Sequence, residues 1–410
     1  MMQKFIKKGY EIVEENEKAD VYVINTCTVT NMADRKSRQM ARRVKEINKN
    51  AILAVCGCYV QVAKDKIEEI EDVDIILGNN EKSDIVEIVE QFEKNKKLEI
   101  ISDVMYQKEY IDFGDITFTN KTRAVIKVQD GCDRFCSYCI IPYARGRVRS
   151  RKIENVVSEI TSLANNGIKE VVITGIHIAS YGKDFKDGTS LIDLLERINQ
   201  IDGIQRIRLG SLEPKLITEE FVNRLSRLPK ICDHFHLSLQ SGCDETLKRM
   251  NRRYTTSEFR DGVEFLKKAY PNVALTTDII VGFPGETEEE FEQTYKFLKD
   301  INFYKMHIFK YSPRKGTKAA IMPKQVDGKI KEERSRRLIE FSDQNTKEHN
   351  EKYIGKELDV LFEERDGEYI KGHTTNYIMV KVKTNNDSIK DKIEKVKIVD
   401  MDNEECLIGE

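Results

Sequence analysis

Short apolar runs alternate with polar stretches of helical character along the first hundred residues. Residues 21–26, 51–55 and 73–77 are rich in β-branched side chains, and a polar, helix-like stretch follows each of them. This alternation predicts an open parallel α/β sheet. Asn31 and Asp34 are candidate caps for a helix over the basic stretch at residues 35–49.

A longer series of the same kind follows. Strands are expected at residues 124–128, 171–174, 206–209, 235–239, 274–281 and 305–310. Helix-like segments lie between them, among them residues 154–166, 218–227, 256–269 and 286–299. Six strand and helix repeats predict a partial (β/α)6 barrel, whose active site lies at the C-terminal ends of its strands.

The end of the chain changes character. After a charged helix near residues 326–353, short strands are expected at residues 357–362, 369–372, 377–383 and 392–399, which predicts a small antiparallel β-barrel. Between the two α/β series, residues 84–120 look like a Lys/Glu-rich helix and an irregular connector. We therefore expect three domains, at residues 1–105, 118–345 and 346–410.

Composition and charge exclude several classes of protein. The 410 residues carry 68 Lys and Arg against 70 Asp and Glu, a net charge of −2, which excludes a uniformly basic nucleic-acid wrapper but not a local basic patch. The chain shows neither an apolar run of the roughly 20 residues that span a bilayer nor the apolar core of a signal peptide. We expect a cytoplasmic protein without a membrane partner.

Cysteine spacing gives the strongest chemical signal. Thiols stay reduced in the cytoplasm, so the nine cysteines are to be read for metal or redox chemistry. Cys132, Cys136 and Cys139 form a C-x3-C-x2-C triplet directly after the first strand of the second series. Three thiolates on one loop can hold three irons of a cubane cluster and leave the fourth iron open. A structural zinc site would need four ligands, and no second cysteine pair of suitable spacing follows.

Residues 127–146 (KVQDGCDRFCSYCIIPYARG) resemble the cluster loop of the radical S-adenosylmethionine methylthiotransferases. Further matching motifs lie in the same order along the chain, at residues 25–30 (NTCTVT), 57–59 (GCY), 174–177 (TGIH), 239–242 (LQSG) and 278–287 (DIIVGFPGET). The resemblance covers nearly the whole chain. It implies an N-terminal methylthiotransferase domain, a radical SAM partial barrel and a C-terminal module similar to the TRAM domain.

The resemblance implies two [4Fe-4S] clusters. Cys132, Cys136 and Cys139 would hold the cluster that binds and reduces S-adenosylmethionine, and Cys27 and Cys58 would be two of three ligands of an auxiliary cluster that supplies sulfur. Family members usually begin with an additional strand and a Leu-Gly-Cys-Lys-Val-Asn-like segment that carries the remaining ligand, and this sequence starts too late to contain it. We therefore expect a missing N-terminal segment, with Cys56 as the alternative third ligand.

Cofactor-binding residues are expected around the cluster and at the strand ends. Tyr138 stands where the superfamily often has an aromatic residue beside the adenine, and Glu213 could bond ribose hydroxyls. Gly175 lacks a Cβ and could let backbone approach the methionine moiety. Gln240 and Asp278 also fall at the expected face of the barrel. The glycines of residues 282–287 lack the Lys-Ser/Thr ending of a phosphate loop and indicate a strand-to-helix turn capped by Thr287.

Basic residues could contact RNA phosphates. Arg145, Arg147, Arg149 and Arg151 leave the cluster loop in a run, and a second group of basic residues lies in the helix with Arg35 to Arg43. An intramolecularly paired surface is the alternative. Residues 347–410 carry 11 Lys and Arg against 16 Asp and Glu, so composition alone does not mark the tail as RNA-binding.

The resemblance is strongest, through residues 174–182 (TGIHIASYG), to the subgroup that acts on N6-threonylcarbamoyladenosine at position 37 of tRNA. It implies a tRNA anticodon stem-loop as substrate and a low-potential electron donor such as flavodoxin or ferredoxin. Two alternatives within the family act on isopentenyladenosine in tRNA or on an aspartate of a ribosomal protein. Outside it, a zinc-stabilised RNA-binding protein and a chain that cleaves S-adenosylmethionine without sulfur transfer remain open.

Overall fold

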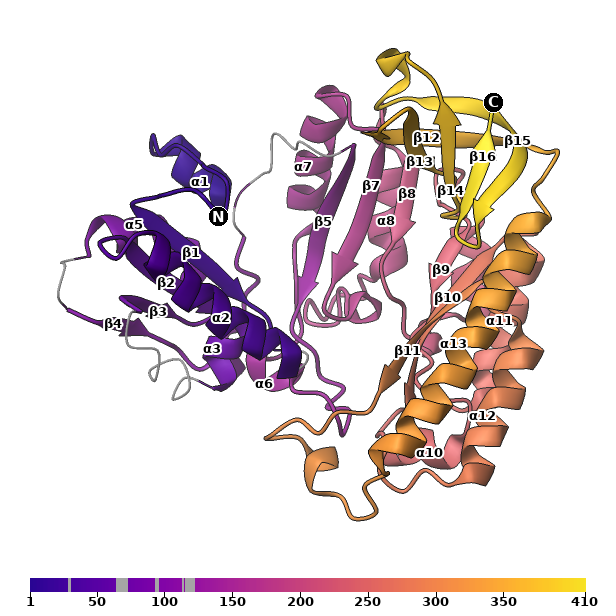
Figure 1. Ribbon diagram of the computed structural model, residues 1–410, viewed down its shortest axis with the longest axis horizontal. Coiled ribbons are helices and arrows are strands. Elements are labelled where there is room, and N and C mark those ends of the chain that lie inside the picture. Colours follow the sequence, from indigo (N-terminus) through magenta and orange to yellow (C-terminus); the bar gives the residue numbers. More distant parts are fainter. Residues whose placement is uncertain (29–30, 64–72, 93–95, 113, 115–121) are drawn as a thin grey trace. The chain divides into compact units, whose positions relative to one another are not determined.

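A computed structural model describes residues 1–28, 31–63, 73–92, 96–112, 114 and 122–410. It divides into two compact units (Figure 1). The first comprises Met1–Gly114, Asp130–Ser150 and Ser312–Ile321, and the second comprises Asp115–Gln129, Arg151–Tyr311 and Met322–Glu410. Each unit is described below by itself.

The first unit is built on a four-stranded parallel sheet in the order β1-β2-β3-β4. Its elements are α1 (Met2–Lys7), β1 (Val21–Thr26), α2 (Asn31–Ile47), β2 (Ile52–Gly57), α3 (Cys58–Val62), β3 (Ile75–Leu77), η1 (Glu81–Asp84), α5 (Ile85–Glu90), β4 (Leu98–Ile100), η2 (Val104–Tyr106), α6 (Ile141–Arg145), β6 (Arg149–Ser150) and η5 (Lys318–Ile321). Apolar side chains such as Leu53 and Val55 on one face, and Ala54 and Ile75 on the other, bury both sides of the sheet, which confirms the predicted open parallel sheet.

Two details of this unit differ from the expectation. Residues 98–100, expected in an irregular connector, form β4, which pairs in parallel with β3. Only Leu98 of its three residues is even half-buried, so its sequence carries little apolar signal. Asp34 does not precede α2 as a cap. It lies in the first turn of the helix, where a carboxylate interacts favourably with the positive end of the helix dipole.

The second unit contains the six expected parallel strands. Strands β5, β7 and β8 pair in one sheet, and β9, β10 and β11 pair in another. Isolated parallel bridges, such as that between Leu212 and Leu237, connect the segments that follow β8 and β9. The elements of this half-barrel are β5 (Arg123–Asp130), α7 (Ile153–Asn165), β7 (Glu170–Gly175), η3 (Ile178–Ser180), α8 (Leu191–Asn199), β8 (Arg206–Leu209), η4 (Pro214–Leu216), α9 (Glu219–Leu225), β9 (His234–His236), α10 (Asp244–Arg249), α11 (Thr256–Ala269), β10 (Ala274–Val281), α12 (Glu288–Ile301), β11 (Lys305–Lys310) and α13 (Gly328–Glu351). The predicted partial barrel is confirmed.

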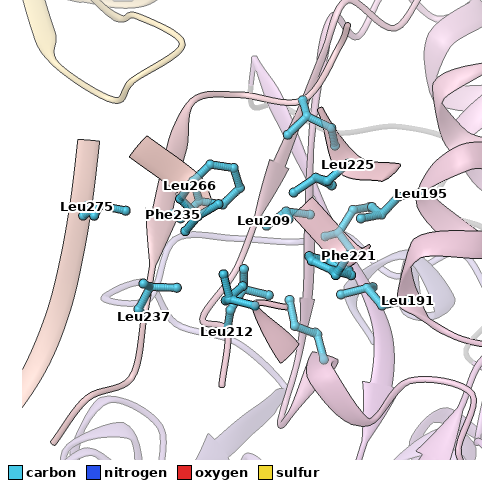
Figure 2. Close-up of a cluster of buried hydrophobic side chains, with 14 of the residues drawn as sticks. Leu191, Leu195, Leu209, Leu212, Phe221, Leu225, Phe235, Leu237, Leu266 and Leu275 are labelled. Carbon is cyan, nitrogen blue, oxygen red and sulfur yellow. The ribbon is translucent and has the colours of Figure 1, made fainter. Parts of the chain in front are cut away.

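Leucine and phenylalanine side chains from the strands and the covering helices form the core of this half-barrel. Figure 2 shows Leu209 and Phe235 from the strands meeting Leu195, Phe221 and others from the helices. Capping residues fix where α11 and α12 begin. The Thr255 and Thr287 side chains each accept a hydrogen bond from the backbone N–H three residues later, as part of a capping box. The turn at residues 282–287 is therefore the strand-to-helix turn that the sequence predicted.

The chain ends in a closed five-stranded barrel in the order β12-β13-β14-β16-β15 (yellow in Figure 1). Its elements are β12 (Glu357–Asp366), β13 (Tyr369–His373), β14 (Met379–Lys383), η6 (Asp387–Ile389), β15 (Ile393–Asn403) and β16 (Cys406–Gly409). The small barrel is confirmed, but closure requires a fifth strand, β16, which pairs in parallel with β14. Arg206 and Arg208 of β8 donate hydrogen bonds to carbonyl oxygens of this barrel, including that of Asp359 at 2.8 Å.

Candidate functional site

Cys27 and Cys58 follow directly after two neighbouring parallel strands of the first unit. Thr26 ends β1 and is in register with Gly57, which ends β2. Gly57 has φ +107°, and a Cβ there would lie 2.5 Å from the carbonyl oxygen of Thr26. Glycine is required at this position because the strand ends approach so closely. The sheet thus carries the two cysteines to the same edge, with Cys27 exposed and Cys58 buried.

Two side chains donate toward the Cys58 sulfur. Arg145 Nε lies 3.0 Å from Cys58 Sγ, and Asn79 Nδ2 lies 3.8 Å from it while donating to the Ala144 carbonyl at 2.6 Å. Arg145 also lies 3.6 Å from Asp130. Burial by itself lowers the pKa of the Arg145 guanidinium, but the negative charges of Asp130 and Cys58 outweigh burial and raise that pKa. Arg145 is therefore a permanent cation beside the thiol.

Cys56 has different surroundings. Its side chain belongs to the buried apolar cluster on the other face of the sheet, and its Sγ lies 3.9 Å from Asn25 Oδ1. Burial raises the pKa of Cys56 to about 11. Cys56 therefore packs among apolar side chains, whereas the Cys58 sulfur faces the donors Arg145 and Asn79.

An arginine that the sequence did not single out holds the loop after Cys27. Arg314 lies 2.7 Å from Asp34 Oδ2 and also donates to Thr28, whose hydroxyl is 3.1 Å from Asp34 Oδ1. All three side chains are buried. Farther along the same segment, Ala319 N donates to the carbonyl of Ser137 at 2.7 Å. Residues 312–321 thus contact both the Cys27 loop and the loop of the cysteine triplet.

The cysteine triplet lies on a tightly folded loop of the first unit. Cys132 N donates to the Gly146 carbonyl and Cys139 N to the Cys136 carbonyl, both at 3.0 Å. Gly131 has φ +71°, and a Cβ there would lie 1.8 Å from the Arg147 carbonyl oxygen. The three cysteines and Tyr138 are half-buried.

The donor set fits an iron–sulfur cluster. All nine cysteines are thiols, and three of them stand on one loop within eight residues. Across the described parts of the chain, the side chains of His, Cys, Asp and Glu do not form a preassembled metal site of three or more groups. The fit therefore rests on the chemistry and spacing of the thiols.

The four arginines after the triplet have unequal surroundings. Arg149 is 3% exposed and donates to the Arg145 carbonyl at 2.8 Å. Arg151, in the second unit, is 4% exposed and pairs with the buried Glu159. Arg147 is the exposed one, 3.3 Å from Asp133 and stacked over the Phe135 ring. Arg145, Arg149 and Arg151 each make an intramolecular contact, and of the four arginines expected to contact RNA, Arg147 alone is exposed.

The expected strand-end residues of the second unit form two groups. At the ends of β5, β7 and β8, Glu213 is buried with its carboxylate 3.4 Å from His177 Nε2, and His177 N donates to Gln129 Oε1 at 2.7 Å. A Cβ on Gly175 would lie 2.9 Å from the Gln129 carbonyl, so the close approach there is to the protein's own backbone. Sequence reasoning passed over Gln129, which lies within β5, six residues after its first residue, and is not one of the residues that the motifs marked as ligands.

The second group comprises His236 at the end of β9, Gln240 four residues farther along the chain, and Asp278 in β10. Gln240 has φ +71° and is buried, and its N donates to the Asp278 carbonyl at 2.8 Å. The Asp278 carboxylate lies 3.2 Å from His236 Nε2. The Nδ1 atoms of His177 and His236 are hydrogen-bonded to the hydroxyls of Ser180 at 2.8 Å and Thr276 at 3.0 Å. Each Nε2 atom lies near one of the carboxylates that the sequence selected.

Family models match both units. The radical SAM superfamily model matches residues 126–298, and a model described as uncharacterized protein family UPF0004 matches residues 1–78. Among the described residues, no helix has the length and apolar character needed to cross a membrane.

Several curated proteins are similar over nearly the whole chain. A threonylcarbamoyladenosine tRNA methylthiotransferase MtaB of Bacillus subtilis (strain 168) is 43% identical over 97% of this chain and 89% of that protein. Its namesake in Aquifex aeolicus (strain VF5) is 42% identical over 93% of this chain and 92% of that protein. A tRNA-2-methylthio-N(6)-dimethylallyladenosine synthase of Clostridium botulinum (strain Loch Maree / Type A3) is 38% identical over 96% of this chain and 89% of that protein.

Among solved structures, the radical S-adenosylmethionine methyltransferase TsrM from Kitasatospora setae matches with a TM-score of 0.58 at 16% identity. The match covers 74% of this chain and 64% of that chain. At this identity the similarity supports the half-barrel fold and carries no information about substrate.

Proposed function

Because the chain belongs to the radical SAM methylthiotransferases that act on tRNA, we propose that its substrate is N6-threonylcarbamoyladenosine at position 37 and its product the 2-methylthio derivative. The observation that carries the substrate is the 43% identity to the Bacillus subtilis protein of that name, against 38% to the dimethylallyladenosine synthase of Clostridium botulinum. The tRNA anticodon stem-loop is the partner, and the electron comes from a low-potential flavodoxin or ferredoxin.

A [4Fe-4S] cluster and S-adenosylmethionine are the cofactors of this family, and together they supply the radical that removes a hydrogen atom from the substrate. We assign Cys132, Cys136 and Cys139 as the cluster ligands. The hydrogen bond from Cys132 N to Gly146 and the turn at Gly131 fix the loop that carries them. Tyr138, half-buried between two of these cysteines, is proposed to contact the adenine.

The strand ends of the second unit are proposed to bind the rest of S-adenosylmethionine. Glu213, held by His177, offers a buried carboxylate for ribose hydroxyls. Gln240, which follows β9, and Asp278, which lies within β10, add an amide and a carboxylate on neighbouring segments. Gly175 keeps the space beside Gln129 clear of a side chain.

Cys27 and Cys58 are proposed as two ligands of the auxiliary cluster. The sheet register brings them to one edge, and Arg145 donates to the Cys58 sulfur. Hydrogen bonds and positive charge beside cluster sulfurs stabilise the thiolate ligands and raise the reduction potential. Arg145 follows the cysteine triplet closely in sequence, so the chain segment that carries one set of thiols also supports the other.

Iron content tests both ligand sets. Relative to the anaerobically reconstituted parent, the Cys132→Ala, Cys136→Ala, Cys139→Ala variant and the Cys27→Ala, Cys58→Ala variant should each lose about four irons. Cys243→Ala, which removes a buried thiol outside both sets, is the control and should retain the parent's iron. Unchanged iron in either variant would contradict that ligand set, and zinc in place of iron would favour the RNA-binding alternative.

Nucleoside composition tests the substrate. Bulk tRNA from a strain without this chain should lack 2-methylthio-N6-threonylcarbamoyladenosine, retain the 2-methylthio derivative of isopentenyladenosine, and regain the missing nucleoside on complementation. Loss of the isopentenyl derivative instead would contradict the proposed substrate. A change confined to a ribosomal protein aspartate would exclude tRNA altogether.

A further inference from the structure

Helix α2 and the turn after it carry a row of exposed cations, Arg35, Lys36, Arg42, Arg43 and Lys49, here called the α2 stripe. From the contacts described below, we infer that the α2 stripe binds the phosphate backbone of the tRNA. This inference rests on the proposed function, from which the tRNA ligand is taken. The stripe includes none of the residues proposed to bind the cofactor or the clusters.

Helical geometry aligns these cations. Arg35 and Arg42 are seven residues apart, as are Lys36 and Arg43, so the members of each pair lie on one side of the helix and about 10 Å apart along its axis. Lys49 extends the row into the turn after Ile47. The helix packs its other side on β1 and β2 through Ala41 and Val44 (Figure 1).

The cations on the packed side of α2 and those on the stripe differ in their partners. On the packed side, Arg38 donates to the Tyr59 hydroxyl at 2.5 Å and Lys45 lies 2.8 Å from Asp74. On the stripe, by contrast, no described acidic side chain forms an ion pair with any of the five cations, and Arg43 donates only to the Asn16 amide oxygen, at 2.5 Å.

The acidic residues of α2 do not neutralise the stripe. Asp34 is already paired with Arg314 at 2.7 Å, which leaves Glu46 as the one other carboxylate of the helix. The stripe therefore presents a net positive charge to solvent. By contrast, Arg336 on α13 of the second unit is exposed and paired with Glu333 and Glu340.

The chemistry of the stripe favours RNA over a protein partner. Phosphate recognition needs charge and hydrogen-bond donors, which arginine and lysine supply, and it does not need an apolar centre. Specific protein interfaces have a core enriched in aromatic and apolar side chains, whereas Met32 is the one strongly exposed large apolar side chain among the described side chains of α2. The helix begins four residues after Cys27, so its cations run from the proposed sulfur-carrying edge along the sheet.

Salt-dependent tRNA binding tests this inference. Fluorescence anisotropy would measure the affinity of the reconstituted protein for a labelled tRNA substrate between about 50 and 200 mM salt. Arg35→Gln/Arg42→Gln should lower the affinity about tenfold and reduce the slope of log K against log salt by about 1.5, because two phosphate contacts are lost. The matched control is Arg336→Gln/Lys347→Gln, which removes the same charge from ion-paired positions on α13 and should change both quantities little.

The outcomes separate this inference from the proposed function. A parent that does not bind tRNA would contradict the proposed function itself. If the parent binds and Arg35→Gln/Arg42→Gln behaves like the control, with parental iron content and circular dichroism, the stripe does not bind RNA. Slower reduction by flavodoxin or ferredoxin with unchanged tRNA affinity would assign the stripe to an acidic electron donor and would also overturn the inference.

Discussion

The run from Arg145 to Arg151 and the helix α2 each carry four arginines, and their guanidinium groups meet opposite surroundings. In the run, three of the four are buried or bonded to Cys58, Asp130 or Glu159. On α2, the helical period places three of the four, Arg35, Arg42 and Arg43, on an exposed side with no described acidic partner. The comparison shows that basic composition does not identify an RNA surface until the partners of each cation are known.

Arg151→Ala should have the largest effect on stability. It would leave the Glu159 carboxylate buried without its ion-pair partner, which typically lowers the free energy of unfolding by about 3–5 kcal/mol. Urea denaturation followed by circular dichroism measures this change. Arg336→Ala, which breaks an exposed pair, is the control. A loss below about 1 kcal/mol would mean that the buried Arg151–Glu159 pair stabilises the fold no more than an exposed ion pair does.

Arg145→Ala should weaken the auxiliary cluster. Loss of a residue that supports a metal ligand usually costs about 10 to 100-fold in metal affinity, because the ligand loses its orientation and its hydrogen bond. Chelator-driven iron loss, measured in the Cys132→Ala, Cys136→Ala, Cys139→Ala background, isolates this cluster. Arg145→Lys keeps the charge but not the Nε donor, and it should lie between Arg145→Ala and the parent. Equal rates of iron loss from Arg145→Ala, Arg145→Lys and the parent would show that Arg145 does not support the auxiliary cluster.

Arg147→Gln tests the exposed member of the run. Its pair with Asp133 and its stacking on Phe135 are solvent-accessible, so the free energy of unfolding should fall by no more than about 1 kcal/mol. If Arg147 contacts a phosphate, as the sequence analysis expects, the slope of log K against log salt for tRNA binding should fall by about 1. An unchanged slope would leave the whole run without an RNA contact.

Arg42→Gln should have the smallest effect on stability. An exposed side chain without an ion-pair partner among the described residues contributes within about 0.5 kcal/mol of zero. The same variant should nevertheless weaken tRNA binding measurably. Arg42 would then contribute to RNA binding and little to stability, whereas Arg151 is expected to contribute mainly to stability. A destabilisation as large as that of Arg151→Ala would show that Arg42 stabilises the fold. It would contradict the difference drawn between α2 and the run from Arg145 to Arg151.

Local pattern was sufficient for the strands whose residues alternate or are rich in β-branched side chains. The bounds of β1, β8, β10 and β11 match the expected runs, because side-chain alternation and β-branched content act over a few neighbouring residues. The strands β4 and β16 were not expected. Each has three or four residues, and only pairing with β3, or closure of the barrel between β14 and β15, gives such a short segment its hydrogen bonds.

The sequence by itself determined the chemistry of this protein: the spacing of Cys132, Cys136 and Cys139, and the order of the surrounding motifs, are properties of adjacent residues. Tertiary structure decided which charges are available. Arg314 and Asp34 are far apart in the chain and meet at 2.7 Å, and Arg145 reaches Cys58 from a distant segment. Burial and pairing depend on neighbours that only the folded chain assembles, so the role of each arginine could be read from the structure and not from the run that contains it.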